Sequence, residues 1–280
     1  MEIGQQPMMQ SREIKIKPST NLLIKLGSYN LSLILSDTKG NIIQYISEKF
    51  EEKIEPKKLS EKLDLVINKS QIINSNVIKV KLIVLNKLSS LVPLNLFQEE
   101  LSLEYLKFNS KLIDGDFAAH DLIDEIEAVN VFLPFVNVNN YLLEKFGSFN
   151  YYHYSTILIK KLIKYNSSKE VSIYANIQSN NFHVIILKNK KLIYYNIFDF
   201  KEKEDILYFL LFVLKQNKID QNKYKLSMLG KIKKESETYL LLTKFINNIE
   251  ILNPKEEITR KKIEKYSEID YVIIWESFLG

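Results

Sequence analysis

The sequence lacks cysteine and has little arginine, histidine, glycine or proline. Without cysteine, disulfides, thiolate metal ligands and cysteine nucleophiles are excluded. Only Arg12 and Arg260 are arginines among the 39 basic residues, and arginine is the side chain best suited to bidentate recognition of phosphates and bases. The formal net charge of +5 is therefore weak evidence for a polyanionic partner, and we predict that nucleic acid is not one.

Long apolar runs are also absent. The longest uncharged apolar segment, residues 206–214 (ILYFLLFVL), has nine residues, whereas a helix that crosses a membrane needs about 18 or more. The N-terminal segment has no hydrophobic signal core and no small-residue cleavage pattern. We therefore predict no membrane span, a cytoplasmic location and a flexible N-terminus at residues 1–13.

Histidine and acidic residues form no familiar metal-binding motif. His120, His153 and His183 lie far apart, without the paired spacing that helical metal sites use. Asp114 and Asp116 resemble a fragment of a calcium-binding loop, but the other ligands of such a loop are missing. We predict a turn at these two aspartates and no metal site.

Strand and helix patterns fill most of the chain, which is 46% hydrophobic and 26% charged, as in an ordinary globular protein. Apolar runs predict strands, and apolar residues three or four apart predict helices. The predicted strands cover residues 21–27, 31–37, 41–48, 77–85, 128–134, 171–177, 182–188, 191–197, 224–229, 249–252 and 271–275, with a further one near 105–117. The predicted helices cover residues 56–73, 93–106, 138–146, 153–165, 203–217 and 236–246. Polar turns at residues 37–41 and 188–191 predict hairpins.

The same order of elements occurs twice: three strands, a helix, a strand and a helix. The two halves share little residue identity, so the architecture repeats and the sequence does not. We predict an α/β protein with two lobes, residues 14–150 and 151–280. Each lobe opens with a three-strand meander that is followed by helices.

Two other segments, 24–35 and 175–187, resemble the phosphate-binding loops of actin-like ATPases. In that family the first turn of each lobe typically reads Asp-x-Gly-Thr-x-x or Asp-x-Gly-Gly-Gly-Thr. Here Lys25 stands at the first acid, Gly27 at the glycine and Ser28 at the threonine, whereas Asn176 stands at the second acid. The second glycine run is replaced by Gln178, Ser179 and Asn180. The adenosine region, which has paired glycines in the family, keeps only Gly230.

The chain as a whole is similar to a family of uncharacterised bacterial proteins with an actin-like fold. The segments that carry this similarity are AVNVFLPF at 128–135, HYSTILIKKL at 153–162, FDFKEKEDILYFLLFVLKQ at 198–216 and LGKIKKESETYLLL at 229–242. The resemblance implies the two-lobed actin-like ATPase fold. It implies no activity.

The loop substitutions remove the groups with which actin-like ATPases hold Mg-ATP. The first-loop aspartate binds Mg²⁺, and small residues let backbone amides approach the phosphates. Lys25 cannot bind Mg²⁺, although it could contact a phosphate as a point charge. Gln178 and Asn180 would fill the phosphate space, and Asn176 is a poor metal ligand. We therefore predict no ATPase activity and no cofactor, and we interpret Lys25 as a solvated lysine at a strand end.

Three functional hypotheses follow. The leading one is a noncatalytic actin-fold protein that acts as a cytoplasmic scaffold or assembly component and binds a protein partner, which the sequence does not identify. The alternative is a divergent nucleotide-binding protein or slow ATPase that uses ATP and Mg²⁺, with Lys25 and Ser28 at the phosphates. RNA binding through the lysine excess is the third, and it would depend steeply on salt.

Two further expectations concern single residues. The helix at 203–217 is apolar around nearly its whole circumference, which predicts burial between a sheet and a second layer, with Leu210 and Phe212 mostly buried. The alternative is that its excess apolar face is exposed to a partner. Gly27 is expected to adopt a positive φ, because glycine does so at little cost.

Overall fold

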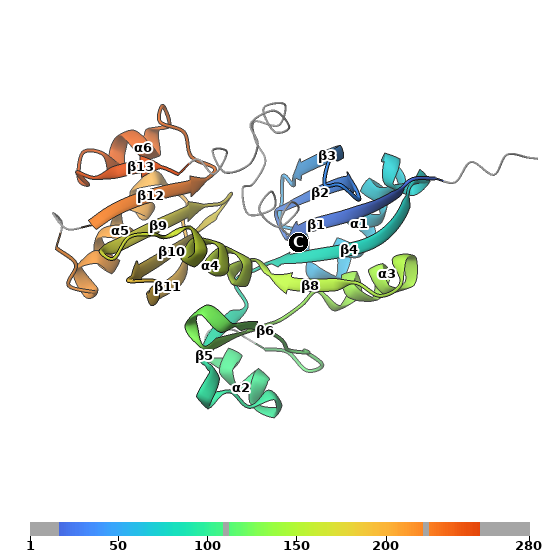
Figure 1. The fold of residues 1–280 in the computed structure, drawn as a ribbon, viewed down its shortest axis with the longest axis horizontal. Coiled ribbons are helices and arrows are strands. Elements are labelled where there is room, and N and C mark those ends of the chain that lie inside the picture. Colours follow the sequence, from blue (N-terminus) through green and yellow to red (C-terminus); the bar gives the residue numbers. More distant parts are fainter. Residues whose placement is uncertain (1–16, 109–111, 221–223, 253–280) are drawn as a thin grey trace, which may run out of the picture.

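The strands of this protein form three sheets. In the computed structural model, which describes residues 17–108, 112–220 and 224–252, the strand orders are β3-β2-β1-β4-β8, β11-β10-β9-β12-β13 and β5-β7-β6 (Figure 1). The predicted flexible segment 1–13 and the predicted strand 271–275 lie outside the described residues.

The first five-stranded sheet begins with an antiparallel meander and continues with two parallel strands. Its strands are β1 (Ser19–Gly27), β2 (Asn30–Asp37), β3 (Ile42–Lys49), β4 (Asn76–Leu85) and β8 (Asn150–His153). Helices α1 (Leu59–Asn68) and α3 (Val136–Phe146) cover one face of it. Alternate β1 residues Leu22, Ile24 and Leu26 pack into the core under these helices, because side chains of a strand alternate between its faces.

The second five-stranded sheet repeats this topology. Its strands are β9 (Val171–Ile177), β10 (Asn181–Lys188), β11 (Lys191–Asp199), β12 (Tyr224–Gly230) and β13 (Ile249–Ile251), and helices α5 (Lys203–Gln216) and α6 (Glu237–Leu242) cover its outer face. Both predicted hairpins are confirmed. Asn189 and Lys190 have φ values of 51° and 62°, as a two-residue turn that matches the strand twist requires.

A third sheet is inserted between β4 and α3, and the sequence did not predict it. It consists of β5 (Ser89–Pro93), β6 (Ala119–Ile123) and β7 (Ala128–Phe132), and it carries α2 (Ser102–Lys107). The strand expected near 105–117 was misplaced, since β6 begins at Ala119. The helix expected at 93–106 consists of two single-turn 3-10 helices followed by α2.

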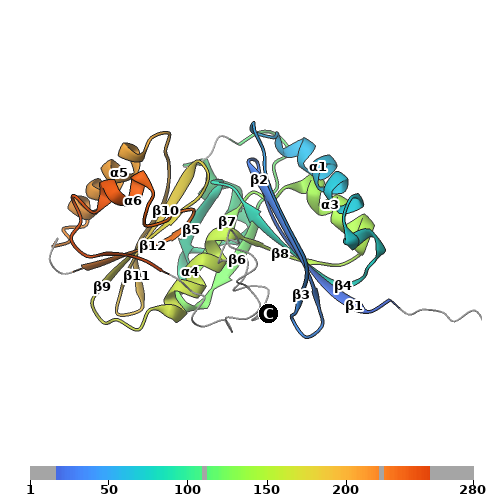
Figure 2. The ribbon, with the colours of Figure 1, turned by 90° about the horizontal axis from the view of Figure 1, so that it is seen from above.

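Helix α4 (Tyr154–Tyr165) lies between the two five-stranded sheets, as Figure 2 shows from above. One continuous core joins this helix to the inner faces of both sheets. Its buried residues include Leu23, Ile34 and Ile83 of the first sheet, Leu158 and Leu162 of α4, and Tyr174, Ile185 and Leu229 of the second sheet. The molecule is therefore layered as helices, sheet, α4, sheet and helices.

Helix α5 is buried on one side only, which corrects the expectation for Phe212. Leu210 is 1% exposed, whereas Phe212 is 46% exposed. The buried residues of α5 are Ile206, Leu210, Val213 and Leu214, which share one helical face. Because α5 is an outermost layer, its other apolar residues have no second layer to pack against. No described helix is long and apolar enough to cross a membrane.

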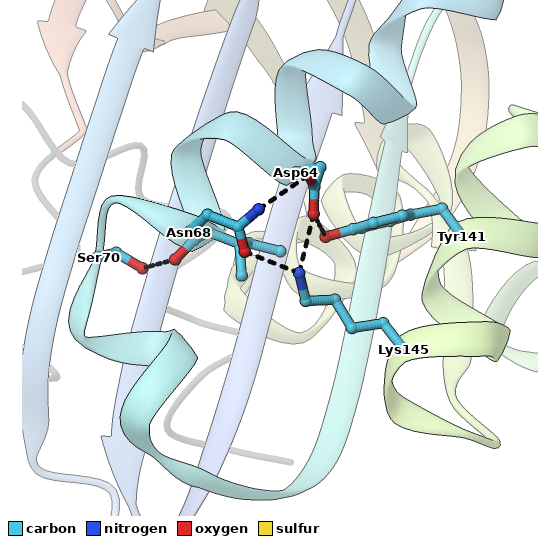
Figure 3. A network of polar contacts seen from close by, with 6 residues as sticks. Asp64, Asn68, Ser70, Tyr141 and Lys145 are labelled. Atoms are coloured by element: carbon cyan, nitrogen blue, oxygen red, sulfur yellow. Dashed lines mark hydrogen bonds and ion pairs between the residues drawn. The ribbon is translucent and has the colours of Figure 1, made fainter.

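A polar cluster joins α1 to α3 on the outer face of the first sheet (Figure 3). Asp64 accepts hydrogen bonds from Tyr141 Oη and Lys145 Nζ, both at 2.8 Å, and Asn68 Nδ2 donates to its other oxygen. The hydrogen bond from Lys145 is the main reason that the pKa of Asp64 is lowered. Each of these four side chains makes at least one hydrogen bond within the cluster, so the cluster serves to hold the two helices together.

Candidate functional site

The two hairpins that resemble phosphate loops meet at one residue, Tyr154. This tyrosine is the first residue of α4 and is fully buried. Lys25 of β1 lies over its ring, with Nζ 5.6 Å from the ring centroid. Asn176 Nδ2 and Gln178 Nε2 donate to its hydroxyl oxygen at 2.8 and 2.9 Å. Tyr154 therefore occupies the space between the first and second hairpins.

Lys25 is buried, which corrects its interpretation as a solvated lysine at a strand end. It is 3% exposed and lies inside β1, where it pairs with Ser32 of β2 and Ile83 of β4. Strand alternation places it on the same face as Leu23, toward α4 and away from α1 and α3. Its cation lies over the electron-rich face of an aromatic ring, an attractive arrangement.

The second hairpin turns its polar side chains inward. Asn176 is fully buried and Gln178 is 3% exposed, and Gln178 Nε2 also donates to Asn176 Oδ1 at 3.3 Å. Gly230 ends β12 beside them with a φ of 86°. A Cβ atom at Gly230 would lie 2.1 Å from the Ile177 carbonyl oxygen and 2.6 Å from Asn176 Oδ1. Glycine is thus required here for close backbone approach.

Gly27 and Ser28 have structural roles at the first turn. Gly27 is not among the residues with positive φ, so that expectation was wrong. Its Cβ would lie 2.8 Å from the Leu85 carbonyl oxygen, so the glycine is needed for the approach of β4. The Ser28 carbonyl accepts from the Ile54 amide at 2.8 Å. The turn is thus held partly by the segment that follows β3.

Ser179 and Asn180, the other two predicted residues of the second loop, lie outside the buried cluster. The Asn180 carbonyl accepts from the Phe200 amide at 3.1 Å. Ser179 Oγ accepts from Lys231 Nζ at 2.8 Å. Of the predicted site residues, the structure therefore brings together Lys25, Asn176, Gln178 and Gly230 around Tyr154.

A second set of contacts extends the cluster into the second sheet. The His183 ring lies 5.3 Å from the Tyr154 ring, and His183 Nδ1 is 3.0 Å from Tyr195 Oη. The Tyr195 hydroxyl also bonds to Ser155 Oγ of α4. The sequence did not indicate that His183, Tyr195 and Ser155 belong to this site, because nothing in their spacing shows that β10, β11 and α4 share a core.

The start of α4 is held by a buried aspartate and a buried histidine. Asp121 Oδ2 accepts from the His153 amide at 2.8 Å and from Thr156 Oγ1 at 2.7 Å. His153 Nδ1 accepts from the Ser155 amide at 3.3 Å, so His153 caps the helix. Its Nε2 lies 3.1 Å from the Asn86 carbonyl oxygen and, as the protonated ring nitrogen, donates to it.

Burial shifts the pKa values of Asp121 and His153 in opposite directions. It raises the pKa of Asp121 from 3.8 to about 6 and lowers the pKa of His153 from 6.5 to about 3. Between pH 4 and 6 the folded chain therefore holds more protons on Asp121 than the unfolded chain, and fewer on His153. Asp121 thus lowers the stability as the pH rises, and His153 lowers it as the pH falls.

We expect Asp121→Asn to separate these opposed contributions. The free energy of unfolding of the variant relative to wild type should rise by about 2–3 kcal/mol between pH 4 and 6, since one pKa unit corresponds to about 1.4 kcal/mol. Urea unfolding followed by circular dichroism across this range measures the difference. A difference that stays constant with pH would contradict the burial argument.

Within the described part of the chain, no group of three or more histidine or acidic residues could hold a metal ion. Asp114 and Asp116 belong to a turn, as predicted: Asp116 Oδ2 accepts from the Ile113 amide at 2.9 Å, and Gly115 has a φ of 88°. The cluster around Tyr154 contains amides, phenols, an imidazole and an ammonium group. These groups form a hydrogen-bonded core more readily than a Mg²⁺ site, which favours carboxylates and water.

Comparison with known families and structures agrees with this architecture. Residues 9–249 match a protein family of unknown function, DUF3822. The chain belongs to this family. No curated protein sequence matches it.

Two solved structures place this DUF3822 protein in a fold class. A Bacteroides thetaiotaomicron protein of unknown function with an actin-like ATPase fold is 22% identical, with a TM-score of 0.72 over 88% of this chain and 95% of that one. The PilM–PilN type IV pilus biogenesis complex gives 14% identity and a TM-score of 0.60 over 92% and 97% of the two chains. The DUF3822 protein has the two-lobed actin-like ATPase fold that the sequence predicted.

Proposed function

We propose that this protein is a noncatalytic member of the actin-like fold, a pseudo-ATPase that acts as a cytoplasmic scaffold or assembly component. Its lobes, in this proposal, are residues 14–150 and 151–280. The observation that supports the absence of catalysis most directly is the buried Tyr154 between the two hairpins. In this proposal, a phenol ring, two amides and a lysine take up the space in which actin-like ATPases hold phosphates.

The energetics favour a permanently filled site. Releasing Tyr154 would remove the acceptor of Asn176 Nδ2 and one of the two acceptors of Gln178 Nε2, which would keep its bond to Asn176 Oδ1. A buried unsatisfied group costs about 1–3 kcal/mol. The release would also expose an aromatic ring, a further loss of about 1.5–3 kcal/mol. A nucleotide would have to offset these terms before it contributed net affinity.

The proposal of a protein partner has separate support. PilM, a protein of the same fold, is found in a complex with PilN. Fold alone does not specify function, so this support is an analogy. It is strengthened by the large apolar side chains that remain exposed on the inserted third sheet and its flanks, namely Leu94, Leu96, Leu101, Phe108, Ile113, Phe117 and Leu122, since exposed apolar groups that gather in one region favour contact with another protein.

One observation favours the alternative of a divergent nucleotide site. Each hairpin has a lysine beside it: Lys25 at the first and Lys231, which donates to Ser179, at the second. Lysine can bind phosphate as a point charge. In this alternative, ATP would enter with Mg²⁺ held by an acid elsewhere, and Lys25 and Ser28 would contact phosphate.

Isothermal titration of the full chain with Mg-ATP separates the two functions. We expect only the heat of dilution at micromolar to millimolar nucleotide, and no release of phosphate over hours. Micromolar binding that is lost in Lys25→Ala, with the circular dichroism spectrum unchanged, would reject the noncatalytic proposal. Lys190→Ala, at an exposed hairpin turn, is the matched control for loss of one lysine.

A further inference from the structure

A groove separates the third sheet from the first five-stranded sheet. It has a volume of about 620 Å³, within the roughly 300–1,000 Å³ typical of ligand sites. Residues Phe117–Asp121, at and just before β6, form one wall, and residues Phe149–Tyr152, at and just before β8, form the other. Glu99, Glu100, Ser102 and Leu103 close a third side.

Both strands that border the groove are edge strands. β6 is the last strand of the three-stranded sheet, and β8 is the last strand of the first five-stranded sheet. Each therefore has one edge that no described strand covers. The two strands are joined where the His153 amide donates to the Asp121 carboxylate, and Asp121, Phe117 and Phe149 all line the groove. In Figure 1, β6 lies below β8.

The groove is lined by acidic and aromatic side chains. Four acidic residues line it, Glu99, Glu100, Asp116 and Asp121, and none of its described lining residues is lysine or arginine. Asp121 is buried and already bonded to His153 and Thr156, so the other three are the carboxylates that a ligand would meet. Aromatic rings of Phe117, Phe149 and Tyr151 provide apolar surface in the same lining, and Phe117 is 58% exposed. This is notable in a chain with an excess of basic residues.

From these observations we propose that the groove binds an extended segment of a partner protein in which lysine or arginine alternates with apolar residues. The segment pairs its backbone with the edge of β6 that no described strand covers, as strand addition at a sheet edge does. Alternate side chains then point to opposite sides of the added strand, so one set contacts the carboxylates and the other contacts the aromatic rings. The inference rests on the proposed function, because it specifies the kind of partner.

A designed peptide tests the proposal on the full chain. The probe is a fluorescein-labelled heptapeptide that alternates lysine and valine, and its binding is measured by fluorescence polarisation. We expect saturable binding that weakens as salt is raised, because exposed charges are screened. A heptapeptide that alternates glutamate and valine should not bind. Equal binding of both peptides, or binding of neither at millimolar concentration, would reject the groove as a basic-strand site.

Charge variants locate the binding surface. Glu99→Gln with Glu100→Gln removes two exposed carboxylates from the groove, and we expect about threefold to tenfold weaker binding, since each exposed pair contributes about 0.2–1 kcal/mol. Glu51→Gln with Glu52→Gln removes two exposed carboxylates near the first meander and should leave binding unchanged. Equal losses in the two variants would show nonspecific attraction and overturn the proposal.

A modified backbone tests the strand pairing itself. A lysine/valine heptapeptide with alternate amide nitrogens methylated keeps its charge but loses the amide donors of one edge. We expect two such peptides, methylated on the odd or the even residues, to differ by about tenfold, because only one edge of an added strand faces β6. Equal binding by both would reject edge pairing. A chain that binds neither the probe peptide nor Mg-ATP would reject the groove and leave the noncatalytic function standing.

Discussion

Replacing Leu210 with alanine is expected to lower the free energy of unfolding by about 2–5 kcal/mol, the cost of a large cavity in a packed core. Leu210 is 1% exposed and lies in the core between α5 and the outer face of the second sheet. The neighbouring layers are regular elements, which collapse poorly around a missing side chain. Urea unfolding followed by circular dichroism measures the change.

Phe212→Ala on the same helix is the matched control. Phe212 is 46% exposed, and its ring lies against the Tyr208 ring, with 6.3 Å between their centroids. Because little cavity would form, we expect a loss below about 1 kcal/mol, as for most surface substitutions. Equal losses in the two variants would show that α5 is buried on both sides, contrary to the exposures observed.

Both meanders were predictable because their strands are long and their turns carry strong signals. Asp37 accepts hydrogen bonds from the amides of Lys39 and Asn41 at 2.9 and 2.7 Å, and Gly40 has a φ of 82°. An aspartate and a glycine at these turn positions can be recognised in the sequence alone. Once the meanders were found, their repetition implied the two-lobed fold.

The short strands of the insertion could not be predicted in the same way. β6 has the residues Ala-His-Asp-Leu-Ile, with a buried aspartate in its middle. That aspartate is placed by its bonds to the start of α4, a contact between residues more than thirty positions apart. Whether a segment forms a strand depends on contacts with residues that are distant in the sequence. The residues of a short segment reveal little about such contacts. β8, with four residues, was missed for the same reason.

The sequence identified several residues that surround the candidate site, but not the buried residue at its centre. Sequence comparison pointed to Lys25, Asn176, Gln178 and Gly230, which the structure does bring together. The side chain that joins them, Tyr154, belongs to an aromatic run that also suits ordinary packing. Its role depends on contacts from β1, β9 and the loop after β9. Asn176 and Gln178 reach Tyr154 from the second sheet, and Lys25 reaches it from the first, so the full set of contacts depends on the packing of both sheets against α4.

Replacing Lys25 with aspartate, the residue that actin-like ATPases have at this position, is expected to cost more than about 3 kcal/mol of stability and to give no ATPase activity. The new carboxylate would lie in a place that is 3% exposed, near the electron-rich face of Tyr154, which repels a negative charge. Asn176 and Gln178 would still hold the Tyr154 hydroxyl in the space between the hairpins.

Lys25→Met is the control, because it keeps the length and apolar stem of lysine and removes only the cation. We expect it to lose about 0.5–2 kcal/mol, the value of a buried cation–π contact. Urea unfolding of both variants, with phosphate release measured at a temperature at which each remains folded, tests the two claims separately. ATP hydrolysis by Lys25→Asp well above that of Lys25→Met would mean that Tyr154 and the second hairpin can move aside for a nucleotide. A loss of stability no greater than that of Lys25→Met would mean instead that the space beside Tyr154 admits water, and the filled interior would no longer support the proposal of a noncatalytic protein.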